Sequence, residues 1–161
     1  MGSTIHLDDL AAPRFSEAVR EMLQGVASIP VDLSEAAVLA AARAQTGLED
    51  FGAGDFRERL GLIVQSMHED TDLSALGKLT NFSMLVRFAA NRLRLEDLIR
   101  RHPEILEIEI RRPIIVAGLA RSGTTHLLNL LSSDTRLRSL PYWEALEPIP
   151  VAGEARDANG A

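Results

Sequence analysis

The sequence contains no cysteine among its 161 residues, and this absence excludes disulfide bonds and thiolate metal sites. It carries a net charge of −6, which argues against a nucleic-acid surface because such a surface needs a basic patch. No apolar run approaches the roughly 20 residues that span a bilayer, and the N-terminus lacks the pattern of a signal peptide. These absences predict a cytoplasmic protein that binds neither nucleic acid nor membrane.

The sequence also lacks the residue spacing of a metal site. Its four histidines have no acidic partners at the intervals that metal ligands require. They are His6, His68, His102 and His126. We therefore expect no metal in this protein.

Apolar residues at helical spacing dominate the first hundred residues or so. Pro13 is expected to open a first helix that includes Phe15, and Asp32, an acceptor with Glu35 three residues on, provides a capping signal for a second helix that Gly47 ends. Asp55 and Asp72 are expected to begin the third and fourth helices. The predicted helices cover residues 13–28, 35–45, 56–67 and 72–93, with further helical turns over 95–101. The arginine-rich run 92–101 is expected to be a solvated helix flank.

The stretch Ile114 to Leu131 combines a β-branched apolar run, a tight turn with glycines five apart, and a leucine-rich helical pattern. This order predicts a strand, a loop and a helix. Unpaired N–H groups at the start of a helix bind anions, and the helix dipole adds positive charge there. Gly118 and Gly123 have no Cβ, so the backbone can approach a phosphate closely. The pattern therefore predicts a phosphate-binding loop.

The loop differs from the usual nucleotide-binding frame G-x-x-x-x-G-K-[ST], because Thr124 occupies the position of the lysine that reaches the β- and γ-phosphates. Arg121 is the single cation of the loop, and the hydroxyl groups of Thr124 and Thr125 add neutral donors. One arginine with several neutral donors suits a single 5′-phosphate that carries an attached group. An isolated turn, a surface salt bridge of Arg121, and helix capping by the two threonines are the simpler alternatives.

The loop, Gly118-Leu119-Ala120-Arg121-Ser122-Gly123-Thr124-Thr125, resembles the 5′-phosphosulfate-binding loop of the sulfotransferase family, G-x-P-[RK]-[ST]-G-[ST]-[ST]. Ala120 differs from the family's proline. Three further segments resemble the helical N-terminal region of a bacterial branch of that family, and Tyr142-Trp143-Glu144 resembles its segment after the second strand. The three segments are Thr46–Gly52, Asn91–Leu98 and His102–Ile105.

The resemblance implies transfer of a sulfuryl group from 3′-phosphoadenosine 5′-phosphosulfate (PAPS) to a hydroxyl or amine of a small-molecule acceptor. It implies that the donor is bound by Gly118, Ala120, Arg121, Ser122, Gly123, Thr124 and Thr125. Arg121 would stabilise charge on the leaving 5′-phosphate, and Glu144 would be the base that takes the acceptor's proton. For Glu144 the alternative is a surface glutamate in a proline-bounded turn. Trp143 either packs under the loop or lines the acceptor site.

Residues 137–140 predict a second short strand, and residues 142–146 predict a helical turn before Pro148. The expected fold is α/β, with a helical region at 1–110 and the start of a P-loop-like parallel sheet at 111–161. Such sheets usually contain more strands than these two. In the resembling family a second half supplies the other strands and the residues that hold the 3′-phosphate. We therefore expect a fragment or a shortened product of a sulfotransferase.

Two other classes of function remain open at this point. A P-loop kinase or ATPase would use the same strand, loop and helix, but it should prefer ADP with magnesium. A non-catalytic interaction module would instead use the exposed apolar faces of 114–116 and of the helix after the loop for association, including association of identical copies. The sequence names neither the acceptor nor the oligomeric state.

Overall fold

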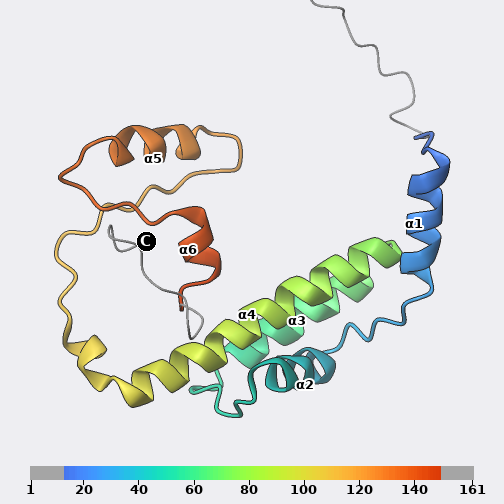
Figure 1. Ribbon diagram of the computed structural model, residues 1–161, viewed down its shortest axis with the longest axis horizontal. Helices are drawn as coiled ribbons and strands as arrows, with labels where there is room; N and C mark the ends of the chain where they lie inside the picture. The colour runs from blue at the N-terminus through green and yellow to red at the C-terminus, as the bar shows by residue number, and fades with distance from the viewer. Residues whose placement is uncertain (1–12, 150–161) are drawn as a thin grey trace, which may run out of the picture. The chain divides into compact units, whose positions relative to one another are not determined.

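The computed structural model describes residues 13–149, and within them it contains six α-helices and one short 3-10 helix. The α-helices are α1 (Glu17–Ala27), α2 (Glu35–Thr46), α3 (Phe56–Glu69), α4 (Ala75–Arg101), α5 (Thr124–Ser132) and α6 (Tyr142–Leu146) (Figure 1). The 3-10 helix η1 spans Pro103–Glu107. The described residues form two compact units, one of residues 13–45 and 53–89 and the other of residues 46–52 and 90–149.

The starts of α1 and α2 are set by serine caps. α1 begins at Glu17 and not at Pro13 as predicted, because the Oγ of Ser16 accepts a hydrogen bond from the N–H of Val19 at 3.4 Å. Phe15 consequently lies before the helix. α2 begins near the predicted signal, but its cap is Ser34 and not Asp32, since the Oγ of Ser34 accepts from the N–H of Ala37 at 3.2 Å.

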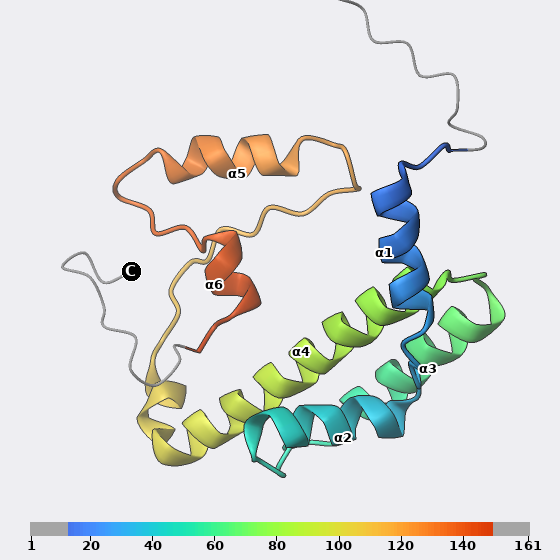
Figure 2. The same ribbon diagram turned by 45° about the vertical axis from the view of Figure 1, so that its right-hand side comes forward.

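Helices α3 and α4 form an antiparallel hairpin along the first part of α4, joined by a short turn at residues 70–74 (Figure 2). Asp55 stands before α3 as predicted, but its carboxylate accepts from Arg59 at 2.7 Å and makes no capping bond. Helix α4 begins at Ala75, three residues after the predicted Asp72, because Ser74 Oγ accepts from the N–H of Gly77. The predicted helix and its extra turns are one continuous helix of 27 residues.

The first unit has a hydrophobic core between α2, α3 and the first part of α4. Its buried side chains are Leu33, Val38, Leu39, Ala42, Leu60, Leu85 and Ala89. Two long-range polar contacts join the same elements: His68 Nε2 lies 2.8 Å from the carbonyl oxygen of Leu33, and Arg57 donates to Glu35 at 3.2 Å. Burial of apolar surface therefore stabilises this unit, and the two polar contacts help to set how its helices align along one another.

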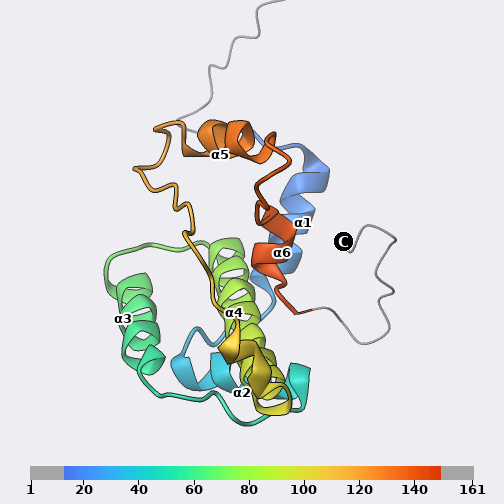
Figure 3. The ribbon, with the colours of Figure 1, turned by 90° about the vertical axis from the view of Figure 1, so that its left-hand side faces the viewer.

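The second unit contains the end of α4, η1, α5 and α6 (Figure 3). Its buried hydrophobic side chains are Phe51, Ala90 and Leu93, and no residue of 102–149 is buried. Residues 113–118 and 138–140 are not helical, but residues 13–149 contain no paired strand. A strand exists only when its backbone bonds to a neighbouring strand. The parallel sheet and the division at residue 110 therefore stay predictions, and residues 150–161 lie outside the described range.

Candidate functional site

The predicted loop forms a tight turn between the extended segment 113–118 and α5. The N–H of Ser122 donates to the carbonyl oxygen of Leu119 at 3.2 Å, and its Oγ donates to the same oxygen at 2.7 Å. Both bonds are local, so the sequence 119–122 itself is enough to close the turn.

Gly118 is pressed against the residues that close this loop. A Cβ at Gly118 would lie 2.7 Å from Ser122 Oγ and 2.9 Å from Thr124 Cγ2. Both distances are shorter than normal van der Waals contacts, so a side chain at this position would push the loop open. The structure thus gives a steric reason for the first glycine of the motif, and it brings Gly118, Ser122 and Thr124 together.

Gly123 leads the chain into α5 with a φ of 91° and a ψ of 11°, a left-handed conformation that favours glycine. Thr124 and Thr125 are the first two residues of the helix, and no side chain caps it. The N–H of Leu127 bonds to the carbonyl oxygen of Gly123 at 3.0 Å, whereas the N–H groups of the preceding turn have no intrahelical acceptor by helix geometry. These donors and the helix dipole make this end of α5 attractive to an anion.

Arg121 is exposed and adopts a φ of 67°, one of two positive φ values among the non-glycine residues of 13–149. Within that range its guanidinium has no ion pair or hydrogen bond, so the surface salt bridge considered from the sequence is not formed there. Ala120, in place of the family's proline, is exposed beside it. The only charged side chain of the loop is therefore available to a ligand.

Glu144 lies in α6, the short helix predicted at 142–146, and its carboxylate accepts a hydrogen bond from the guanidinium of Arg138. Within the described residues, no hydrogen bond or ion pair joins Glu144 to the loop. Trp143 is 58% exposed and is not packed in a core. Sequence reasoning missed Arg138, although a basic residue six positions before the candidate base was a visible signal.

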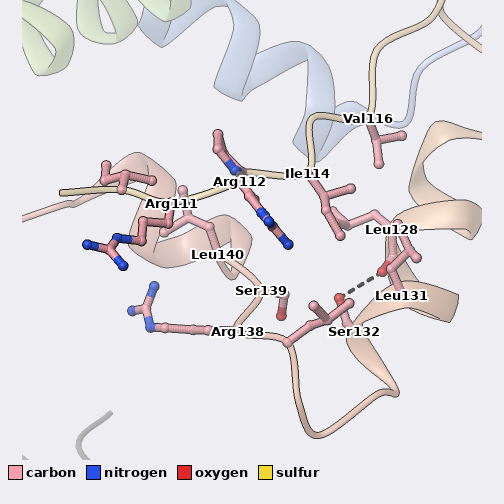
Figure 4. A pocket seen from close by; sticks show the side chains of 13 residues that line it. Arg111, Arg112, Ile114, Val116, Leu128, Leu131, Ser132, Arg138, Ser139 and Leu140 are labelled. Atoms are coloured by element: carbon pink, nitrogen blue, oxygen red, sulfur yellow. Dashed lines mark hydrogen bonds between the residues drawn. The ribbon is translucent and has the colours of Figure 1, made fainter.

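An apolar cleft of about 570 Å³ lies between segment 110–116, helix α5 and segment 137–140 (Figure 4). Its labelled apolar side chains are Ile114, Val116, Leu128, Leu131 and Leu140, and three arginines, Arg111, Arg112 and Arg138, line it as well. Ser132 Oγ donates to the carbonyl oxygen of Leu128 at 2.7 Å, so this hydroxyl is satisfied by its own helix. The cleft separates the two segments that the sequence predicts as neighbouring strands.

The turn after α5 is held by Asp134 and Arg136. Arg136 Nη2 lies 2.6 Å from Asp134 Oδ2, and the Arg136 side chain, followed by its backbone N–H, lowers the pKa of Asp134 below its usual value. This turn directs the chain from α5 toward 137–140. The predicted turn at Asp134 is thereby confirmed.

Two segments that carried the resemblance, Thr46–Gly52 and Asn91–Leu98, contact each other. Arg92 Nε donates to the carbonyl oxygen of Phe51 at 2.6 Å, and a Cβ at Gly52 would lie 2.3 Å from the Glu96 carboxylate. Gly52 has a φ of 68° and therefore needs to be glycine for conformational reasons too. The prediction that the arginines of 92–101 are merely solvated is wrong for Arg92, which holds a loop against α4.

Comparison with solved structures finds a protein with the same fold and a related sequence. The crystal structure of sulfotransferase STF1 from Mycobacterium tuberculosis H37Rv superimposes with a TM-score of 0.67 and 34% sequence identity over 73% of this chain. This chain belongs to the sulfotransferase family. It spans 33% of the length of STF1. No family model and no curated protein matches the chain.

Two further findings concern only the part of the chain that the structure describes. In the described part of the chain, no helix has the length and apolarity required to cross a bilayer. No group of three or more potential metal ligands lies together within residues 13–149.

Proposed function

We propose that this chain carries the donor-binding loop of a PAPS-dependent sulfotransferase that acts on a hydroxyl or amine of a small molecule. The observation that carries this proposal is the closed loop, in which Gly118 abuts Ser122 and Thr124 and Gly123 delivers the chain into α5. The family membership supports a sulfuryl transferase in general. The identity of the donor rests on the loop.

The residues present fit the 5′-phosphate of PAPS. The side chain that Gly118 lacks would collide with the loop, and its absence lets backbone N–H groups gather around one small anion. Arg121 adds one full positive charge without a competing carboxylate among the described residues, and Thr124 and Thr125 add hydroxyl donors. With threonine in place of the Walker lysine, the loop suits one phosphate better than a triphosphate.

When bound, PAPS supplies the sulfuryl group and a phosphate leaving group. Glu144 accepts the proton of the acceptor hydroxyl or amine while the acceptor's oxygen or nitrogen forms a bond to sulfur. The bond between sulfur and the phosphate oxygen breaks, and its electron pair stays on that oxygen. Arg121 and the N–H groups of α5 stabilise the charge that grows there. Glu144 exchanges its contact with Arg138 for one with the acceptor during this step.

The test is a calorimetric titration of the chain with adenosine 3′,5′-bisphosphate, the product left when PAPS loses its sulfuryl group. We expect Arg121→Ala to weaken binding by tenfold or more, about 1.4 kcal/mol, because it removes the loop's charge. Arg136→Ala is the matched control, since that exposed arginine already pairs with Asp134. Equal affinities for the wild type and Arg121→Ala would contradict the proposal.

A titration with ADP and magnesium separates the two nucleotide-binding interpretations. A kinase or ATPase would bind ADP with magnesium more tightly than adenosine 3′,5′-bisphosphate, and Thr124→Lys would then strengthen that binding. For the sulfotransferase we expect the opposite preference and no gain from Thr124→Lys. Either result assigns the loop to one class of nucleotide.

Exposed apolar side chains favour association as a second candidate function. Ile115 is 81% exposed, Leu119 is 85% exposed and Leu130 is 57% exposed. Exposed apolar side chains of this kind are typical of a surface that another polypeptide covers, including a second copy of this chain. A molecular mass that rises with concentration, measured by sedimentation, together with no nucleotide binding, would favour this candidate over the enzyme.

A further inference from the structure

The C-terminal end of α6 is attached to α4 by one long-range hydrogen bond. Asn91 Nδ2 donates to the carbonyl oxygen of Leu146 at 2.6 Å, across 55 positions of sequence. Helix α6 has five residues, none of them buried. A helix this short is unstable in isolation. Its placement therefore depends on such attachments.

Arg94 orients the amide of Asn91 for this contact. Arg94 Nη1 donates to Asn91 Oδ1 at 3.3 Å and lies 3.9 Å from Glu147 Oε2, at the residue that ends α6. The amide oxygen faces Arg94, so the NH₂ group faces Leu146. Asn91 and Arg94 are one turn apart on α4. Together they contact the carbonyl oxygen of Leu146, the last residue of α6, and the side-chain carboxylate of Glu147, which follows it.

This attachment lies close to the candidate base. Glu144 is two residues before Leu146 in the same helix, and its carboxylate contacts Arg138. A shift or rotation of α6 would move the carboxylate of Glu144 and the ring of Trp143 together. A displacement of about 1 Å in a catalytic group can lower the reaction rate about a hundredfold.

We propose that Asn91 is a positioning residue that fixes α6, and through it Glu144, for proton transfer from the acceptor. This inference rests on the proposed function, in which Glu144 is the base. Within the described residues, no hydrogen bond joins Asn91 to the loop or to Glu144, and its action passes through the backbone of α6. It gives a role to the first residue of Asn91–Leu98, one of the segments that carried the resemblance.

The chain offers a matched pair of variants on one helix. Asn91→Asp replaces the donor to Leu146 with a carboxylate that repels its carbonyl oxygen, while the size of the side chain and the contact with Arg94 are kept. Asn81→Asp is the control, because Asn81 Nδ2 donates at 2.8 Å to Gly77, a carbonyl of α4 itself. Neither asparagine belongs to the buried core. Far-UV circular dichroism verifies that both variants fold, and Arg94→Met is a second, milder disruption.

The first measurement is independent of catalysis, because Trp143 is the single tryptophan of the chain and lies in α6. We expect Asn91→Asp to raise the acrylamide quenching constant of Trp143. The largest possible increase corresponds to full exposure of the indole ring, compared with its present exposure of 58%. Arg94→Met should give a smaller rise in the same direction, and Asn81→Asp should give none. An unchanged quenching constant in Asn91→Asp would overturn the attachment, whatever the activity.

The second measurement uses PAPS alone, with water as the acceptor, and follows the release of adenosine 3′,5′-bisphosphate and sulfate. We expect Asn91→Asp to lower this rate about tenfold to a hundredfold, with the affinity for adenosine 3′,5′-bisphosphate unchanged. If Asn91 acts through Glu144, it should have no further effect in a Glu144→Gln background. Additive losses, or a rate equal to that of the wild type, would overturn the positioning role.

The two measurements also separate this inference from the function on which it rests. A wild type that neither binds adenosine 3′,5′-bisphosphate nor turns over PAPS refutes the proposed function and the catalytic role of Asn91 with it. Trp143 quenching would in that case still decide whether Asn91 holds α6. A wild type that is active, with Asn91→Asp affected only in quenching, refutes the positioning role and leaves the sulfotransferase function intact.

Discussion

The first unit and the stretch from residue 102 to 149 are stabilised in different ways. In the first unit, α2, α3 and the start of α4 bury side chains such as Val38, which is completely inaccessible to solvent. In residues 102–149 no residue is buried, and the bonds that shape the loop are local turns and helix ends. One region is held by a core, and the loop of the other is held by short-range hydrogen bonds.

This difference teaches where function and stability can be altered separately. A loop whose geometry comes from bonds within residues 118–124 can keep its shape without a large core beneath it. Changes in the core of the first unit should therefore affect unfolding, and changes in the loop should affect ligand binding. The following substitutions test that separation.

The largest expected effect is on the free energy of unfolding of the helical region. Leu39→Ala removes a side chain that is 3% exposed and should cost about 2–5 kcal/mol. Leu106→Ala removes one that is 71% exposed and should change stability by no more than about 0.5 kcal/mol. Urea unfolding followed by circular dichroism at 222 nm measures both. Similar losses in the two variants would break the comparison between the regions.

A smaller effect is expected in the loop, and on binding. Gly118→Ala places a methyl group 2.7 Å from Ser122 Oγ and should weaken binding of adenosine 3′,5′-bisphosphate about tenfold, about 1.4 kcal/mol. Gly25→Ala in α1 is the control, because its methyl group meets no atom within 4 Å. It should leave binding unchanged and stabilise the helix by up to about 1 kcal/mol. Equal affinity of both variants for the ligand would refute the steric role of Gly118.

The smallest expected effect is electrostatic and depends on pH. Hydrogen bonds from Arg100 and then Arg101 lower the pKa of Asp97 below its ordinary value of 3.8. A carboxylate with a lowered pKa in the folded state adds stability above its unfolded-state pKa, and this stability is lost as the pH falls through the folded-state pKa. We expect Asp97→Asn to have a lower Tm than the wild type at pH 7, and the difference to shrink below pH 3.8.

The control for this measurement is Asp72→Asn, because Asp72 is exposed and has no ion pair within residues 13–149. Its Tm should follow that of the wild type across the same pH range. A Tm difference for Asp97→Asn that is as large at pH 3 as at pH 7 would show that the arginine contacts of Asp97 do not carry the effect.

Local signals in the sequence located most of the helices and the loop. The start of α2 at Glu35, its end near Gly47 and the left-handed turn at Gly123 each depend on residues within a few positions, so composition and spacing reveal them. The errors at the helix starts were also local. Ser16 and Ser74 provide caps in place of Pro13 and Asp72, and a serine cap is hard to distinguish from other polar residues nearby.

Contacts between distant residues left no such signal. The bond from Asn91 to Leu146 and the bond from Arg92 to Phe51 span 55 and 41 positions, and neither partner has an unusual sequence neighbourhood. From sequence alone, an arginine in a helix is predicted to be solvated, even where its guanidinium donates to a carbonyl oxygen of a distant segment. For that reason the sequence predicted where Glu144 lies along the chain, but not the contact that attaches its helix α6 to α4.

The left-handed backbone of Arg121 affects how tightly any ligand can bind. For a residue with a Cβ, this conformation costs about 1–2 kcal/mol of conformational free energy, whereas glycine adopts it without that cost. This cost narrows the free-energy gap between the described loop and any conformation in which the backbone of Arg121 has left the left-handed region. Only the fraction of molecules with the strained loop can bind in the arrangement described, and apparent affinity falls in proportion to that fraction. The loop thus carries a charged side chain at a position where glycine would cost less conformational free energy, and a smaller fraction of molecules holds the ligand-binding conformation.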